Sequence, residues 1–212
     1  MIKFTIFGIK FVVSVGFIGV LTLMLYIDRA GLMLPTITAI TLHEAGHIAA
    51  LMLLKAKPER VELKFGAVGI SGSFVLSRSS EIVMFAAGSV LNIFLFFILY
   101  FLYYFSDIEI LLTFSIVMLV IGLFNLLPIV GLDGGSILNA VLGAFLKAQT
   151  VGRIIFVLSI ITITLIIAFG ICVLSDTKSN ITLILMGLYL FLGILLSKKQ
   201  KNDCKMPLNI VK

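Results

Sequence analysis

Long apolar stretches, separated by short polar segments, dominate the sequence. A helix that crosses the hydrocarbon core of a bilayer needs about 20 mostly apolar residues, because the core is about 30 Å thick and each residue advances about 1.5 Å. The pattern therefore predicts an all-α membrane protein, a polytopic bundle of about six transmembrane helices. The stretches are residues 4–27, 31–54, 82–105, 110–130, 154–174 and 181–197, of which the last is the shortest. The first has no small-residue cleavage site after it, so we interpret it as a retained span and not as a signal peptide.

The longest polar insertion, residues 55–81, has a different period. Residues 61–65 alternate apolar and charged side chains, which is typical of a strand, and Gly69 and Gly72 follow before a second apolar run. This pattern predicts a small cytoplasm-facing β-hairpin at the membrane surface, with an edge that could pair with an extended peptide. The alternative is a flexible, partly buried connector.

Composition supports a membrane protein and excludes several other classes. Hydrophobic residues make up 61% of the chain and charged residues 12%, about half of the charged share in soluble domains, and the mean hydropathy is +1.25. The net charge of +6 does not indicate nucleic-acid binding, because the basic residues punctuate apolar runs instead of gathering in one region. Cys172 and Cys204 have no partner at a bridging or metal-binding spacing, so we expect two free thiols.

The basic residues predict how the spans are oriented. Positive charges concentrate on the cytoplasmic side of membrane proteins, and six spans place both termini on one side. Nearly all of the Lys and Arg then share the side of the termini, whereas the turns near Asp107 and Asp176 lie on the other. We therefore expect a multi-pass protein of the cell membrane with both termini cytoplasmic. Residues 1–197 would form one integral-membrane domain with its core at 31–136, and residues 198–212 a short basic tail.

Ionisable side chains inside the second stretch indicate a metal site. A charged group at membrane depth costs at least about 2.5 to 3.5 kcal/mol, so each one requires a reason. His43, Glu44 and His47 form the pattern HExxH, in which two His four residues apart share one helical face and can bind one zinc ion. The Glu can then reach a water molecule beside the metal as a general base. The alternative is a polar transport pathway, which also uses His and Glu in membranes.

A catalytic zinc ion usually has three protein ligands, and Asp133 is the candidate for the third. It follows the fourth stretch in the segment NLLPIVGLDGG, which begins at Asn125 and where Pro128 and three Gly are expected to break the helix. Irregular backbone near membrane depth is tolerated only inside protein or beside a watery cavity, so the break indicates an interior site. With the predicted orientation, His47 and Asp133 both lie near the cytoplasmic side. The alternative is that Asp133 only caps a helix that begins near Ser136.

HEAGH in one span and NLLPIVGLDGG in another, with the segment AGSVLN between them, resemble the site-2 protease family of intramembrane zinc metalloproteases. The resemblance covers about residues 31–136, and the predicted six spans are most similar to the stage IV sporulation endopeptidase branch. It implies one Zn²⁺ per chain, with His43, His47 and Asp133 as ligands and Glu44 as the catalytic residue. It also implies that the enzyme hydrolyses a peptide bond within or next to a membrane-associated segment of a protein, such as a transcription-factor or sigma-factor precursor.

Several supporting residues and partners follow from the same resemblance. Asn125 matches an Asn near the family's site, and Asn92 belongs to a segment in which Ser89 replaces the family's usual Pro. The chain leaves no room for the CBS or PDZ domains of many relatives, so we expect control by another membrane protein. Gly69 and Gly72 could help to hold an unwound substrate. The functional alternatives are a small metal- or proton-linked transporter and a catalytically silent, partner-binding relative; no nucleic acid is expected, and the sequence does not predict the oligomeric state.

Overall fold

The computed structural model describes the backbone of residues 2–6, 9–13, 19, 22, 25–26, 28, 31–56, 60–64, 67–71, 76–177 and 182–203. The chain divides into two compact units, Met1–Leu126 and Leu127–Lys212. The prediction of one membrane domain over residues 1–197 stays a prediction.

The chain begins with two strands, where the sequence predicted the start of a helical span. β1 (Ile2–Ile6) and β2 (Ile9–Val13) pair antiparallel, with Phe4 opposite Phe11. The prediction of a single helix over residues 4–27 is therefore wrong for residues 4–6 and 9–13. The misleading signal was the high mean hydropathy of this run. Lys3 and Thr5 alternate with apolar residues in β1, as is typical of a strand, and Lys10 is a charged position in β2.

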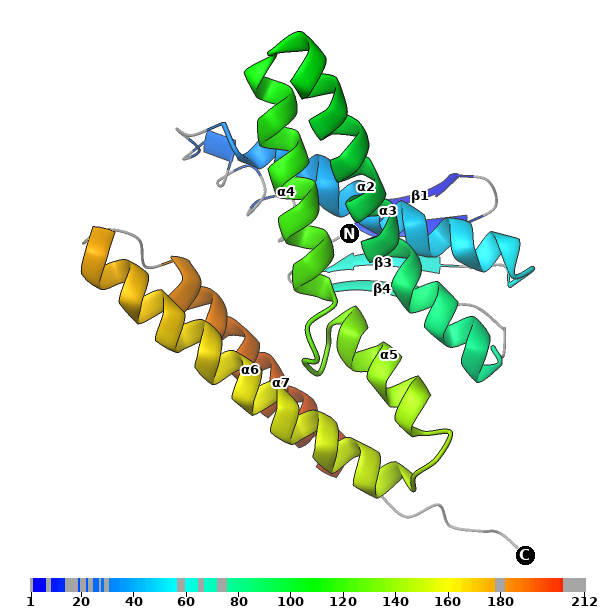
Figure 1. The fold of residues 1–212 in the computed structure, drawn as a ribbon. Coiled ribbons are helices and arrows are strands. Elements are labelled where there is room, and N and C mark those ends of the chain that lie inside the picture. The colour runs from blue at the N-terminus through cyan, green and yellow to red at the C-terminus, as the bar shows by residue number, and fades with distance from the viewer. Residues whose placement is uncertain are drawn as a thin grey trace, which may run out of the picture. The chain divides into compact units, whose positions relative to one another are not determined.

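These two strands belong to a four-stranded sheet of order β1-β2-β3-β4 (Figure 1). β3 (Arg60–Lys64) pairs parallel with β2 and antiparallel with β4 (Ala67–Ser71), and Glu62 faces Gly69 in that register. The all-α prediction is therefore incomplete. Within the described strands β1 and β4 are the edges of the sheet, and the expected location of this region at the cytoplasmic membrane surface stays a prediction.

Among its described residues the first unit also contains the helices α2 (Met33–Leu53), α3 (Arg78–Ser106) and α4 (Glu109–Asn125). Polar caps fix two of their starts. The carboxylate of Asp28 accepts hydrogen bonds from the backbone N–H groups of Leu32 (3.3 Å) and Met33 (2.8 Å), and the Ser77 hydroxyl accepts one from the N–H of Ser80 at 3.2 Å. Such caps satisfy the free N–H groups at a helix start.

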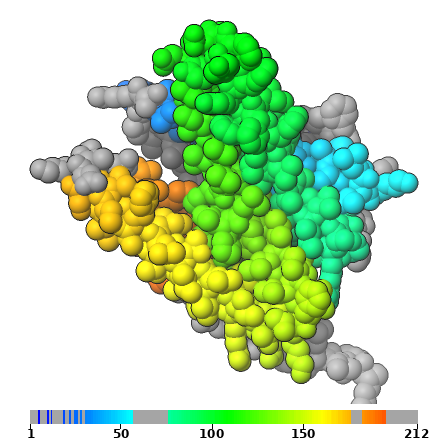
Figure 2. Space-filling view, viewed as in Figure 1, coloured from blue at the N-terminus to red at the C-terminus, as the bar shows by residue number. Residues whose placement is uncertain are grey.

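Small residues allow these helices to approach closely. A Cβ atom added to Gly46 on α2 would lie 2.9 Å from the Ala87 carbonyl oxygen and 2.9 Å from the Gly88 Cα atom on α3. A Cβ atom on Gly122 of α4 would lie 3.2 Å from the Asn92 Cβ atom on α3. Close backbone approach through small residues is typical of helix packing in membranes, where lipid removes the hydrophobic driving force between helices. Figure 2 shows the side chains of α3 and α4 as one packed surface.

The second unit contains α5 (Asp133–Leu142), α6 (Ala148–Thr177) and α7 (Thr182–Asp203). Its core contains Ile129 from the segment before α5, Ile163 from α6 and Ile194 from α7. Gly170 and Gly187 lie where α6 and α7 pack side by side (Figure 1), and a Cβ atom on either would lie within 3.0 Å of an isoleucine side chain of the other helix. α7 continues past residue 197, so residues 198–203 of the expected tail are helical.

Three of the described helices are long and apolar enough to cross a membrane: Met33–Leu53, Arg78–Ser106 and Ala148–Ser175. Only 17% of the apolar window in α3 is buried inside the protein, as expected for a helix that faces lipid. Glu109–Asn125 and Thr182–Ile194 are apolar but shorter. The count of six spans is not confirmed, and the fourth predicted stretch ends as a helix at Asn125, three residues before Pro128.

Candidate metal centre

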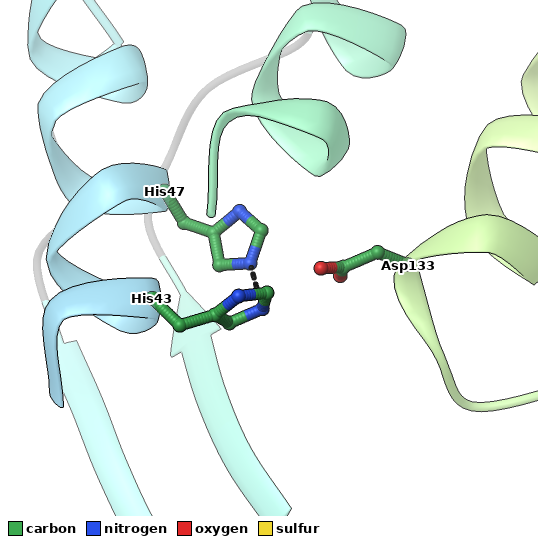
Figure 3. Close-up of side chains that lie close together, drawn as sticks. All are labelled: His43, His47 and Asp133. Atoms are coloured by element: carbon green, nitrogen blue, oxygen red, sulfur yellow. Dashed lines mark hydrogen bonds between the residues drawn. The ribbon is translucent and has the colours of Figure 1, made fainter. Parts of the chain in front are cut away.

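The two histidines of the HExxH pattern lie on one face of α2, inside the first unit. His43 is 4% and His47 is 6% exposed, and their ring planes meet at 86°. Their Nε2 atoms lie 3.1 Å apart (Figure 3). Two nitrogen ligands of a tetrahedral zinc ion, each about 2.0–2.1 Å from the metal, lie about 3.3–3.4 Å apart. The two rings are therefore already close to the separation that a shared metal ion requires.

A hydrogen bond to α3 determines which nitrogen of His47 can bind a metal. The Nδ1 atom of His47 lies 2.7 Å from the backbone carbonyl oxygen of Met84. Because a carbonyl oxygen can only accept, Nδ1 must carry the proton, and in a neutral ring Nε2 then carries the lone pair that can accept a hydrogen bond or bind a metal. Metal-bound histidines generally donate their second ring N–H in this way, which fixes both tautomer and ring orientation.

The His47 ring fits against α3 because Gly88 has no side chain. A Cβ atom at this position would lie 2.6 Å from His47 Nε2 and 2.8 Å from the backbone oxygen of His43. α3 therefore contacts His47 at two points, with the Met84 carbonyl at Nδ1 and the Gly88 backbone beside Nε2. Together these contacts restrict the ring to one orientation.

Asp133 is the first residue of α5, in the second unit, and its side chain is half-buried. The capping alternative placed the helix start near Ser136, but the helix begins at Asp133 and Leu132 is in the N-cap position. A carboxylate in the first helical turn is stabilised by the helix dipole. His43, His47 and Asp133 each offer one ligand atom that could bind a metal ion. Two imidazoles and a carboxylate are a donor set that suits zinc.

Glu44 occupies the next position on α2 after His43 and is half-buried. Glu44 thus holds the sequence position that the general base has in HExxH sites.

Two of the other predicted residues, Asn92 and Asn125, make hydrogen bonds that indicate structural roles. Asn92 is fully buried, and its Nδ2 donates to the backbone oxygen of Ala39 on α2 at 3.3 Å. This contact supports the interpretation that Asn92 forms a hydrogen bond between helices. The Asn125 amide donates to the Ile121 oxygen of its own helix at 3.0 Å. Gly69 lies in β4, and Gly72 falls outside the described residues.

The sequence reasoning missed Met84 and Gly88 as parts of this site. The contribution of Met84 is a backbone carbonyl, which any residue at that position would supply, so no residue pattern could reveal it. Gly88 did leave a signal, because it stands inside an apolar helix near Ser89 and Asn92, but only the packing of α3 on α2 shows that it faces His47.

The fold matches a solved structure. The site-2 protease from Methanocaldococcus jannaschii superposes with a TM-score of 0.64 over 100% of this chain and 99% of that chain, at 23% sequence identity. The fold is that of a site-2 protease. A comparison with protein families finds no match, and no curated protein matches the sequence. The site-2 protease fold thus agrees with the family that HEAGH and NLLPIVGLDGG indicated, while the sporulation branch stays a prediction.

Proposed function

We propose that the chain is an intramembrane zinc metalloendopeptidase that hydrolyses a peptide bond within or next to a membrane-associated segment of a protein substrate. The observation that carries this proposal is the pair of buried imidazoles, His43 and His47, with Nε2 atoms 3.1 Å apart and one tautomer fixed by the Met84 carbonyl. A transport pathway would not require two imidazole Nε2 atoms to lie 3.1 Å apart. The site-2 protease fold and the apolar helices support the membrane setting.

In this proposal His43, His47 and Asp133 hold one zinc ion per chain. Bound zinc would polarise the scissile carbonyl and lower the pKa of a water molecule to about 7. Glu44 would take a proton from the attacking water and deliver it to the amide nitrogen as the C–N bond breaks. The Met84 carbonyl and the Gly88 backbone would keep the His47 ring in its metal-binding orientation.

The substrate must lose helical structure before it can react, because a transmembrane helix hides its carbonyl groups in hydrogen bonds. We propose that the edge of β4 pairs with the unwound segment, since β4 has β3 as its neighbour on one side only in the described sheet. Proline has no N–H group and cannot take part in a full ladder. Proline replacements at residues 68–71 should therefore weaken cleavage in protein that still folds and binds metal, and unchanged cleavage would refute this step.

We further propose that both termini are cytoplasmic, that the site lies near the cytoplasmic side, and that another membrane protein regulates the enzyme. The charge distribution of the sequence supports the orientation. Cysteine-accessibility labelling from either side of sealed vesicles tests it, with single cysteines at positions 55 and 107. We expect labelling of position 55 from the cytoplasmic side and of position 107 from the other side, and the reverse pattern would contradict the orientation.

Cleavage of membrane-spanning peptides tests the enzymatic claim. Purified protein would be mixed in detergent with labelled single-span peptides that carry Gly, Asn or Pro inside the apolar segment, because such residues lower the cost of unwinding. We expect cleavage by the wild type and none by Glu44→Gln with its metal retained. Cleavage that survives Glu44→Gln would refute the assigned base. A wild type that binds zinc but cleaves no helix-broken peptide would favour the catalytically silent relative.

A further inference from the structure

We infer that Ser159, on α6, is a positioning residue for the metal ligand Asp133. This inference rests on the proposed metal-binding role of Asp133. All of its structural evidence lies within the second unit, in the irregular segment between α4 and α5. The relevant feature is a buried serine hydroxyl that joins this segment to the neighbouring helix.

The Ser159 side chain is fully buried, with an exposed fraction of 0%. Its hydroxyl oxygen accepts a hydrogen bond from the backbone N–H of Val130 at 2.9 Å. The single hydroxyl proton faces two carbonyl oxygens, that of Ile155 at 2.7 Å in its own helix and that of Pro128 at 3.3 Å. The hydroxyls of Thr162, Thr164 and Ser175 in α6 donate to carbonyl oxygens of the preceding turn of their own helix, whereas Ser159 also contacts another segment.

The hydrogen bonds of Ser159 to Pro128 and Val130 stabilise a segment that does not have the hydrogen-bond pattern of a helix. Pro128 has no N–H group, and the Gly131 backbone has a φ of +97°, which residues with a side chain rarely adopt. In the low-dielectric interior of a membrane protein, every backbone N–H needs a partner. In the described structure the Val130 N–H donates to the Ser159 hydroxyl oxygen.

The same segment is joined rigidly to the start of α5. The Ile129 side chain is buried in the core with Ile163, and the Ile129 carbonyl oxygen accepts a hydrogen bond from the Leu132 N–H at 3.1 Å. That oxygen also lies directly against Gly135, where an added Cβ atom would overlap it. A shift of residues 128–130 would therefore move the first turn of α5, and Asp133 lies in that turn. Removal of the Ser159 hydroxyl should release this segment and displace the carboxylate.

Zinc affinity of the purified, detergent-solubilised full chain tests the inference. Loss of a residue that orients a metal ligand typically weakens metal binding by about 10- to 100-fold, and we expect Ser159→Ala to weaken zinc binding by at least about tenfold. Two controls lose a hydroxyl of the same helix that bonds only to the preceding turn: Ser175→Ala, the same chemical change, and Thr162→Val, at a part-buried position. Both should bind zinc with wild-type affinity.

A second substitution, at Asp133, shows whether Ser159 acts by positioning the Asp133 carboxylate or by stabilising the protein in general. Asp133→Ala is expected to lose its zinc during purification, so the weaker binding by the two remaining ligands is titrated with added zinc. If Ser159 acts through Asp133, then Ser159→Ala should weaken zinc binding about tenfold in the wild type but should change this residual affinity by no more than about twofold in Asp133→Ala. An equal loss in both backgrounds, or no loss in either, would overturn the inference. If Ser159→Ala does not fold, Ser159→Cys keeps the volume with a much weaker hydrogen-bonding group, and wild-type zinc affinity in that variant would overturn the inference equally. A wild type that binds no metal would instead refute the proposed function.

Discussion

Replacement of Gly88 by alanine would place a methyl group against the metal-binding edge of His47. The new Cβ atom would lie 2.6 Å from His47 Nε2, 2.8 Å from His47 Cε1 and 2.8 Å from the His43 backbone oxygen. To restore an ordinary contact of 3.4 Å, His47 Nε2 must move by about 0.8 Å relative to α3, whereas metal–ligand distances tolerate only about 0.2 Å. The ring has little freedom to move, because Met84 of the same helix holds Nδ1 at 2.7 Å.

We therefore expect Gly88→Ala to weaken zinc binding by at least about tenfold, which is the typical cost of disturbing a ligand's orientation. Overpacking of a well-packed interior also costs about 1–3 kcal/mol, so the free energy of unfolding should fall as well. The assay is zinc affinity by competition with a chromophoric chelator in detergent. Thermal unfolding, measured in parallel, reports the loss of stability.

Two matched variants isolate the effect on His47. Gly46→Ala crowds the same pair of helices, with contacts of 2.9 Å to the Ala87 oxygen and the Gly88 Cα atom, but its three nearest atoms include none from His47. Gly152→Ala on α6 meets nothing within 4 Å. Gly46→Ala should lose stability with a smaller loss of zinc affinity, and Gly152→Ala should match the wild type. Equal zinc affinity in Gly88→Ala and Gly46→Ala would refute the specific role of Gly88.

Three further outcomes are expected. Asn92→Ala removes the hydrogen bond to the Ala39 oxygen and should lower stability in a denaturant titration by about 0.6 kcal/mol, up to about 1.7, with one zinc still bound; loss of the metal would place Asn92 in the site. Gly135→Ala should push the first turn of α5 away from the Ile129 carbonyl and weaken zinc binding measured by chelator competition, and unchanged binding would contradict the rigid link between them. Zinc removal by a chelator should abolish peptide cleavage, and zinc added back in excess should restore it, whereas cleavage by metal-free protein would exclude a zinc mechanism.

Much of the candidate site could be predicted because its chemistry leaves local patterns. His43 and His47 are four residues apart, so any helix brings them to one face, and the apolar residues around them predicted that helix. Pro128 and the glycines after it predicted that a helix would end before Asp133, and α4 does end at Asn125. These features depend only on residues that are close together in the sequence. They can therefore be predicted without knowing how the helices pack.

The parts that the sequence did not reveal depend on contacts between distant segments. The Met84 carbonyl and the Gly88 backbone affect His47 only because α3 packs on α2, and Ser159 affects the segment before Asp133 only because α6 lies beside it. The prediction of a helix over residues 4–27 was wrong at β1 and β2 for another reason. Mean hydropathy measures only how apolar a segment is, and it takes no account of the alternation of Lys3 and Thr5 with apolar residues in β1.

The metal content of purified protein tests the central claim most directly, because it needs no substrate. We expect about one zinc ion per wild-type chain, loss of that ion in His43→Ala, His47→Ala and Asp133→Ala, and its retention in Glu44→Gln. The last variant also controls for nonspecific binding, because it changes a carboxylate beside the site that is not a ligand. Wild-type protein without metal, or a zinc content in Asp133→Ala equal to that of the wild type, would contradict the three-ligand site.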